Sequence, residues 1–181
     1  MKFRQFLNEE EQKYKSSGTS INISKLPATF GKLDKLAVVK EGMVIADLGG
    51  GRYDNAIKWA EDKGAKLFVI DQFNRTDEYN NKSKKSIKSN GGADIVTVNN
   101  VLNVIMEKDI RADVLKEAKG YLKGGGTIYI LIYEGNGSGE GKETQKGQSW
   151  QNNKKTAEYL DEVKKVFPSA SVKSGMIVAT K

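Results

Sequence analysis

The chain has 181 residues, a formal net charge of +7, and neither cysteine nor histidine. This length supports one domain with a hydrophobic core and is too short for two domains of ordinary size. The two missing residue types exclude disulfide bonds, zinc sites of the usual cysteine and histidine kinds, and serine–histidine or cysteine–histidine nucleophiles.

Residues 1–40 are predicted to form a helical cover for the domain. Apolar residues recur at helical spacing over residues 3–15, which favours an amphipathic helix. Residues 21–26 are expected to be extended, and a second helix is expected to begin at Pro27 and to end at Lys40–Gly42. The first ten residues turn acidic where a signal peptide has an apolar stretch, and no run is long enough for a membrane span, so we expect a cytoplasmic location and no membrane partner.

From residue 43 onward, short apolar runs alternate with helical patterns. No strand is expected between Asp71 and Asp94, where the lysine-rich stretch 82–88 indicates a solvated helix face or a mobile loop. A glycine-rich surface loop is expected over residues 134–150. The expected strands are Met43–Leu48, Leu67–Ile70, Ile95–Val98 and Thr127–Tyr133, with helices over 54–63, around Val114–Leu122 and over 153–166, and a terminal hairpin of 170–173 with 176–179.

This alternation implies a mostly parallel sheet with helices on both faces. We therefore predict a doubly wound α/β fold, one Rossmann-like domain over residues 1–181, with an antiparallel terminal strand.

Gly49-Gly50-Gly51 directly follows the first strand, and Asp71 ends the second strand twenty residues later. Glycine permits positive φ and lets a ligand approach the backbone, and such a turn lies at the carboxyl ends of the strands, where ligands of these sheets bind. Asp71 is placed to accept hydrogen bonds from the ribose hydroxyls of an adenosine. Turn and acid together predict a nucleotide-type cofactor site.

The residues of the turn favour a positively charged ligand over a pyrophosphate. Asp54 occupies the position of the third glycine of the dinucleotide fingerprint, and no phosphate-binding Gly-Lys-Ser/Thr follows. Carboxylates at Asp47 and Asp54 would repel phosphate and would stabilise an amine.

The stretch Asp47-Leu48-Gly49-Gly50-Gly51 resembles the first motif of the class I S-adenosylmethionine-dependent methyltransferases, an acid and an apolar residue before Gly-x-Gly. The resemblance covers roughly residues 40–135. It implies S-adenosylmethionine as cofactor, with its methionine part on the turn, its ribose at Asp71 and its adenine beside Gln72 and Phe73. Two features depart from the family: Tyr53 stands where many members have a third glycine, and one strand of the usual sheet is missing.

The stretch Val98–Ile105 is also similar to that of small methyltransferase-like proteins found in phages and beside DNA-modification genes. This similarity implies a phage or DNA-modification role and defines no substrate.

Direct methyl transfer needs an acceptor lone pair aligned with the reacting carbon, so positioning supplies most of the catalysis. Candidate catalytic and substrate-binding residues are therefore expected after the third and fourth strands and in an active-site loop over residues 135–153. Asn99 is also a candidate cofactor ligand, and the Asn99–Asn100 pair equally fits a turn. Trp150 offers a stacking surface for a flat ring, but a tryptophan of this kind more often serves packing. The catalytic candidates are Asn99, Asn100, Tyr133 and Glu134, and the substrate-binding candidates are Trp150, Gln151 and Asn152.

The resemblance predicts a methyltransferase that acts on a nucleic acid or a small molecule without a covalent intermediate. The positive charge fits nucleic acid, but nearly all of it is lysine, and arginine is the residue that contacts phosphate and guanine in a bidentate way. The Asp/Asn-Pro-Pro-aromatic motif of amino-directed DNA methyltransferases is absent, and the lack of cysteine excludes the usual covalent route to cytosine C5. The alternative is an S-adenosylmethionine-binding protein without transferase activity, which sequesters or cleaves the cofactor or serves as an accessory subunit. No pattern indicates a metal site.

Overall fold

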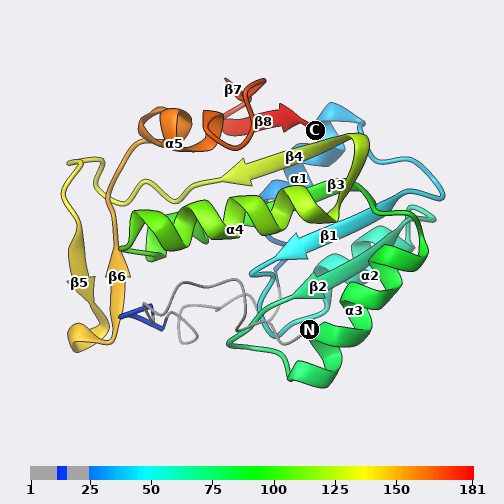
Figure 1. The fold of residues 1–181 in the computed structure, drawn as a ribbon, viewed down its shortest axis with the longest axis horizontal. Helices are drawn as coiled ribbons and strands as arrows, with labels where there is room; N and C mark the ends of the chain where they lie inside the picture. The colour runs from blue at the N-terminus through cyan, green and yellow to red at the C-terminus, as the bar shows by residue number, and fades with distance from the viewer. Residues whose placement is uncertain (1–11, 16–24) are drawn as a thin grey trace.

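The computed structural model describes residues 12–15 and 25–181, and its centre is a six-stranded sheet (Figure 1). The strand order is β2-β1-β3-β4-β8-β7, in which the first four strands are parallel, β8 is antiparallel to β4, and β7 is antiparallel to β8. The strands of this sheet are β1 (Val44–Leu48), β2 (Lys66–Ile70), β3 (Ala93–Asn99), β4 (Leu122–Leu131), β7 (Ser171–Lys173) and β8 (Met176–Thr180).

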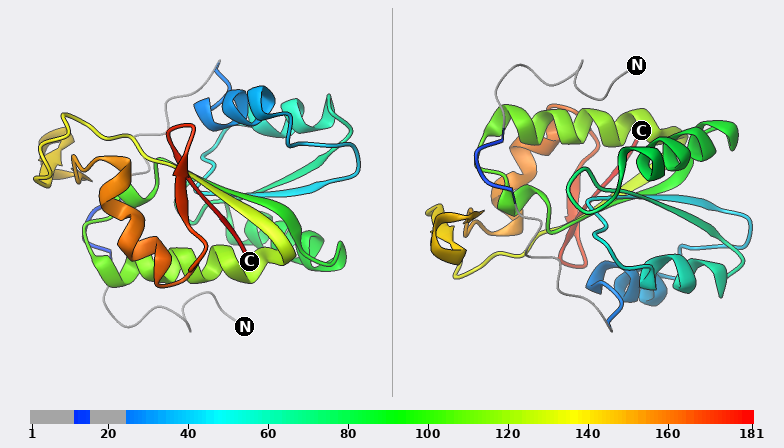
Figure 2. Two further views of the ribbon diagram at one scale, coloured as in Figure 1. Left: turned by 90° about the horizontal axis from the view of Figure 1, so that it is seen from above. Right: turned by 90° about the horizontal axis from the view of Figure 1, so that it is seen from below.

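Helices cover both faces of the sheet and enclose two apolar cores (Figure 2). Helices α1 and α2 pack on one face through residues such as Phe30 and Ala60, and α3, α4 and α5 pack on the other through residues such as Leu115 and Val163. All five residues of β1 are buried, as expected for a central parallel strand. The helices are α1 (Ala28–Leu36), α2 (Asn55–Glu61), α3 (Asp77–Ser89), α4 (Lys108–Tyr121) and α5 (Leu160–Lys164), with 3-10 turns η3 (Leu102–Val104), η4 (Gln145–Gly147) and η5 (Thr156–Tyr159).

The lysine-rich stretch between β2 and β3 forms helix α3, so the expectation of a solvated helix face is confirmed. Thr76 caps this helix, because its hydroxyl accepts a hydrogen bond from the Tyr79 N–H at 3.2 Å. Residues 71–92 contain no strand, which confirms the expectation for this segment.

Three expectations about the remaining segments are wrong. Helix α1 ends at Leu36 and not at Lys40–Gly42, because Ala37 turns into the left-handed region with φ 52°. The expected loop 134–150 contains a hairpin of β5 (Lys142–Thr144) and β6 (Ser149–Gln151), and the helix expected over 153–166 is reduced to η5 and α5.

The N-terminal predictions are tested only in part. Residues 12–15 are not helical, and the rest of the amphipathic helix expected over residues 3–15 lies outside the described residues. The same holds for most of the extended segment expected over residues 21–26. Tyr14 is buried, and its ring stacks on Trp150 of β6 with the ring centroids 5.4 Å apart.

Among the helices of the described ranges, none has the length and apolar character that crossing a bilayer requires. The same residues hold no group of three acidic, cysteine or histidine side chains arranged to bind a metal ion.

Candidate cofactor site

The glycine turn joins β1 to α2 at the carboxyl edge of the parallel strands. Gly49 and Gly51 have φ values of +69° and +78°, which side-chain-bearing residues rarely adopt. A Cβ atom at Gly49 would collide with Cγ2 of Val101, and one at Gly50 would collide with Oδ2 of Asp47. The turn therefore requires glycine for its backbone conformation and for its close approach to neighbouring side chains.

Asp47, at the end of β1, is a fully buried acid beneath this turn. Its Oδ1 accepts hydrogen bonds from the Thr97 hydroxyl at 2.6 Å and the Asn99 side-chain amide at 3.1 Å, whereas its Oδ2 has no partner among the described residues. Burial raises the pKa of Asp47 from 3.8 to about 7, despite the opposing hydrogen bonds from Thr97 and Asn99. The unpartnered oxygen faces Gly50, so a cation bound at the turn would stabilise the ionised form.

Asp71, at the end of β2, is also buried, and its carboxylate binds the chain's own donors. Its Oδ2 accepts from the Gly51 N–H at 2.9 Å, and its Oδ1 accepts from the N–H groups of Phe73 at 2.9 Å and Asn74 at 2.8 Å. The Asn74 side-chain amide lies 3.2 Å from both oxygens. These five bonds fill the acceptor capacity of a carboxylate, so Asp71 ties the glycine turn to the loop after β2. Its contact with ribose stays a prediction.

Arg75, which no sequence motif marks, reinforces this connection. Its Nε donates to the Gly51 carbonyl at 2.8 Å, and its Nη2 pairs with Asp54 at 2.7 Å. Asp54 stands at the N-cap of α2 but makes no side-chain cap hydrogen bond. The expectation that Asp54 stabilises a cationic ligand is therefore not supported, because its carboxylate is already paired, and Asp47 is left as the acid beneath the turn.

Asn99 and Asn100 end β3 beside the same turn. The Asn99 amide donates to Asp47, and its Oδ1 accepts from the hydroxyl of Thr29 on α1, another residue that the sequence analysis missed. Asn100 is exposed, has a left-handed φ of 52°, and donates its N–H to the Leu131 carbonyl at 2.9 Å. Asn99 thus belongs to the Asp47 cluster, while Asn100 forms the turn that leaves the strand.

Tyr133 and Glu134 follow β4. Tyr133 is 61% exposed, the largest value among the exposed large apolar side chains of the described residues. Glu134 accepts a hydrogen bond from the Thr156 N–H at 2.7 Å, which lowers the pKa of its carboxyl. Glu134 therefore holds the start of η5, and its catalytic role stays a prediction.

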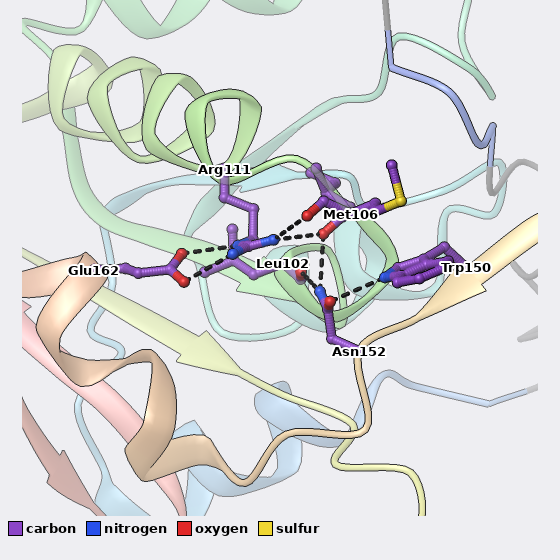
Figure 3. Close-up of polar contacts among 7 residues, drawn as sticks. Leu102, Met106, Arg111, Trp150, Asn152 and Glu162 are labelled. Atoms are coloured by element: carbon purple, nitrogen blue, oxygen red, sulfur yellow. Dashed lines mark hydrogen bonds and ion pairs between the residues drawn. The ribbon is translucent and has the colours of Figure 1, made fainter. Parts of the chain in front are cut away.

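The three substrate-binding candidates lie on or next to β6, in the hairpin at the end of the molecule toward which β1 and β4 point (Figure 1). Gln151 accepts from Asn103 at 3.0 Å and donates to the Tyr133 carbonyl at 2.9 Å. Asn152 donates to two carbonyls of the loop after β3 and accepts from Trp150 (Figure 3). Trp150 stacks on Tyr14, so the packing interpretation describes these residues better, and their contact with a substrate stays a prediction.

The structure thus brings the cofactor candidates Asp47, Gly49–Gly51, Asp71 and Asn99 together at the turn. Gln72 and Phe73 follow Asp71 directly, Gln72 exposed and Phe73 half-buried, beside the turn that Asp71 holds.

Comparison with known proteins shows which fold the chain has. No protein-family model and no curated protein sequence matches the chain. Among solved structures, the 1,6-didemethyltoxoflavin-N1-methyltransferase of Burkholderia thailandensis, with bound 1,6-didemethyltoxoflavin and S-adenosylhomocysteine, aligns with a TM-score of 0.61 and 15% identity over 85% of this chain and 76% of that chain. The chain has the class I methyltransferase fold.

Two further methyltransferases share this class I fold. Phosphoethanolamine N-methyltransferase 2 of Haemonchus contortus, in complex with S-adenosyl-L-methionine, has a TM-score of 0.56 and 17% identity over 84% of this chain, which spans 40% of that longer protein. A TehB-like methyltransferase of Corynebacterium glutamicum has a TM-score of 0.50 and 15% identity over 85% of this chain and 95% of that chain. The predicted doubly wound sheet with antiparallel terminal strands is confirmed.

Proposed function

We propose that this protein binds S-adenosylmethionine at the glycine turn and transfers a methyl group from it to a nucleic acid or a small molecule by direct displacement. The observation that carries the proposal is the buried Asp47, whose unpartnered Oδ2 lies against Gly50 in a turn that admits no side chains. A buried acid of this kind favours a ligand that brings positive charge. The likeness to methyltransferases crystallised with S-adenosylmethionine or S-adenosylhomocysteine supports this ligand.

The residues present fit such a cofactor along the carboxyl edge of β1 and β2. Asp47 and Gly49–Gly51 would hold its methionine part, and Gln72 and Phe73 would flank its adenine. The ribose hydroxyls would reach Asp71 in place of the Asn74 amide, whose hydrogen bonds of 3.2 Å are the longest that this carboxylate accepts. Asn99 would orient Asp47, since its side-chain amide already donates to that carboxylate.

When bound, S-adenosylmethionine supplies an electrophilic methyl group. The chain has neither cysteine nor histidine, so direct attack by an acceptor that Asn99, Asn100, Tyr133 and Glu134 orient is the mechanism that its residues support. The named substrate of the Burkholderia neighbour is a small molecule, which supports that acceptor class, whereas the net charge of +7 supports a nucleic acid. A cytoplasmic location is part of the proposal for either acceptor, and a link to phage or DNA-modification functions belongs to its nucleic-acid form.

A second candidate function is cofactor binding without methyl transfer, by a sequestering, cleaving or accessory protein. The internal hydrogen bonds of Gln151, Asn152 and Glu134 favour it, because these side chains are less available to an acceptor.

Calorimetric titration with S-adenosylmethionine, S-adenosylhomocysteine and NAD tests the cofactor. We expect the first two to bind and NAD not to bind, and no binding of the first two would refute both candidate functions. Incubation with methyl-labelled S-adenosylmethionine and separate pools of DNA, RNA, protein and metabolites then separates them. Label in one pool supports transfer and names the acceptor class, and binding without label in any pool supports the second candidate.

A further inference from the structure

Three carbonyl groups of the loop after β3 are held by two buried side chains, one from helix α4 and one from the segment after β6 (Figure 3). Arg111 of α4, which is 1% exposed, donates through Nη1 to the carbonyls of Ile105 and Met106, both at 2.8 Å. Asn152, which follows β6, donates through Nδ2 to the carbonyls of Leu102 at 3.1 Å and Ile105 at 2.8 Å. The Ile105 carbonyl therefore receives one donor from each side.

Each of these two side chains is itself fixed by a further partner. Arg111 forms a bidentate pair with Glu162 of α5, with Nε and Nη2 each 2.8 Å from a carboxylate oxygen. The Asn152 Oδ1 accepts from Trp150 Nε1 at 2.9 Å, and the Trp150 ring stacks on Tyr14. The bidentate, charge-assisted Arg111–Glu162 pair fixes orientation as well as distance, so the guanidinium meets the loop carbonyls in one geometry.

The anchored loop is in contact with the glycine turn. Val101 lies between Asn99–Asn100 and the anchored carbonyls, and its Cγ2 occupies the space into which a side chain at Gly49 would project. Gly49 has a positive φ and donates its N–H to the Ile70 carbonyl, so it has little freedom to follow a displaced Val101. A shift of the loop would therefore press on the turn or leave a gap beside it.

Net stability alone is a weak reason for such a network. Replacing a buried ion pair by apolar side chains of similar size is often neutral or stabilising, whereas removal of one partner is costly. Geometry is what Arg111 and Glu162 supply that an apolar pair would not, because an apolar side chain in place of Arg111 has no donor for the carbonyls of Ile105 and Met106.

We propose that Arg111 and Asn152 are positioning residues of the cofactor site, which fix residues 101–106 so that Val101 and Asn99 hold the glycine turn in its binding conformation. This inference rests on the proposed function, since the quantity that it predicts is the affinity for S-adenosylhomocysteine. It assigns to Asn152 a role in the protein interior in place of contact with an acceptor.

The test uses Arg111→Met/Glu162→Leu, which removes both charges together and leaves no ion buried alone. The matched control is Lys84→Met/Glu117→Leu, which removes another ion pair of α4, one that joins it to α3 with a separation of 3.6 Å. Thermal unfolding and calorimetric titration with S-adenosylhomocysteine are measured for both. We expect the dissociation constant to rise about 10-fold or more in the first double variant, as small misplacements at a distance can cause, and to stay unchanged in the control.

Two single variants keep the test valid if the double variant does not fold. Asn152→Asp places an oxygen against two carbonyls and should weaken binding. Asn90→Asp makes the same change at the C-cap of α3, where the amide bonds to the Ser86 carbonyl at 2.7 Å, and should not weaken binding. Val101→Ala removes the contact between loop and turn and should raise the dissociation constant several-fold. A purely structural role would lower the unfolding temperature and leave the dissociation constant of the folded protein unchanged.

The outcomes separate this inference from the proposed function. Binding of S-adenosylhomocysteine by the unaltered protein, with unaltered affinity in the folded Arg111, Asn152 and Val101 variants, refutes the positioning role alone. Failure of the unaltered protein to bind S-adenosylmethionine and S-adenosylhomocysteine refutes the proposed function and this inference together.

Discussion

Replacement of Asp47 by asparagine should remove a pH dependence of folding that the unaltered protein shows between pH 5 and pH 8. Burial raises the pKa of Asp47 from 3.8 to about 7 in the folded protein. Between these values the folded state holds a proton that the unfolded state has lost, so the stability contributed by this group falls as the pH rises. The asparagine side chain of the variant has no such proton to lose.

The size of the effect follows from the two pKa values. Each pH unit between them changes the free energy of unfolding by about 1.4 kcal/mol, and about two such units lie between pH 5 and the folded pKa. The unaltered protein should therefore lose about 3 kcal/mol relative to Asp47→Asn between pH 5 and pH 8. Asparagine keeps the oxygen that accepts from Thr97 and Asn99, and any other cost of the amide is independent of pH.

Urea unfolding of both proteins without cofactor, at constant ionic strength and at pH 5, 6, 7 and 8, measures this difference. Other groups, such as Glu117, whose pKa is raised by burial, titrate in both proteins and cancel in the comparison. A difference between the two proteins that stays constant over this range would show that Asp47 is ionised throughout. The reasoning that burial without a partner for Oδ2 raises the pKa of Asp47 would then be refuted.

Three further substitutions test the turn and its supports. Gly50→Ala should destabilise the protein by about 1–3 kcal/mol in urea unfolding and abolish S-adenosylhomocysteine binding in calorimetry, because the new Cβ would meet a buried carboxylate oxygen. The control Gly31→Ala in α1, where the new Cβ has open space around it, should be neutral or slightly stabilising in unfolding and unchanged in binding. Asp71→Ala should lower cofactor affinity and should lower the free energy of unfolding by about 3 kcal/mol or more, because three backbone N–H groups lose their acceptor. Unchanged stability would contradict the conclusion that Asp71 holds these N–H groups. Tyr14→Ala should cost about 2–4 kcal/mol in urea unfolding because the ring is buried on the β5–β6 hairpin, and a loss below about 1 kcal/mol would show that this contact is loose.

The structure changes one of these expectations in a specific way. From the sequence, Asp71 is a ligand for ribose, and its removal should affect binding only. In the folded protein its carboxylate caps the N–H groups of Gly51, Phe73 and Asn74, so binding and stability should fall together.

The site residues that no sequence pattern marks have one physical feature in common. Thr29, Arg75 and Arg111 each bond to a partner that lies between 24 and 70 positions away in the chain, so no local period or motif marks them. Composition holds one signal that could have found two of them: in a chain whose positive charge is nearly all lysine, arginine at a few positions indicates a need for its planar, multidentate donors.

The sequence by itself determined the α/β alternation, the place of the glycine turn and the acids beside it. These features depend on local properties: the apolar period of each element, the φ angles that glycine allows, and the position of an acid at a strand end. Only the tertiary structure decided what each polar group does, because hydrogen-bond capacity is finite and its partners come from remote segments. Packing paired Asp54 with Arg75, saturated Asp71, turned Gln151 and Asn152 inward, and left one oxygen of Asp47 without a partner among the described residues, facing the turn.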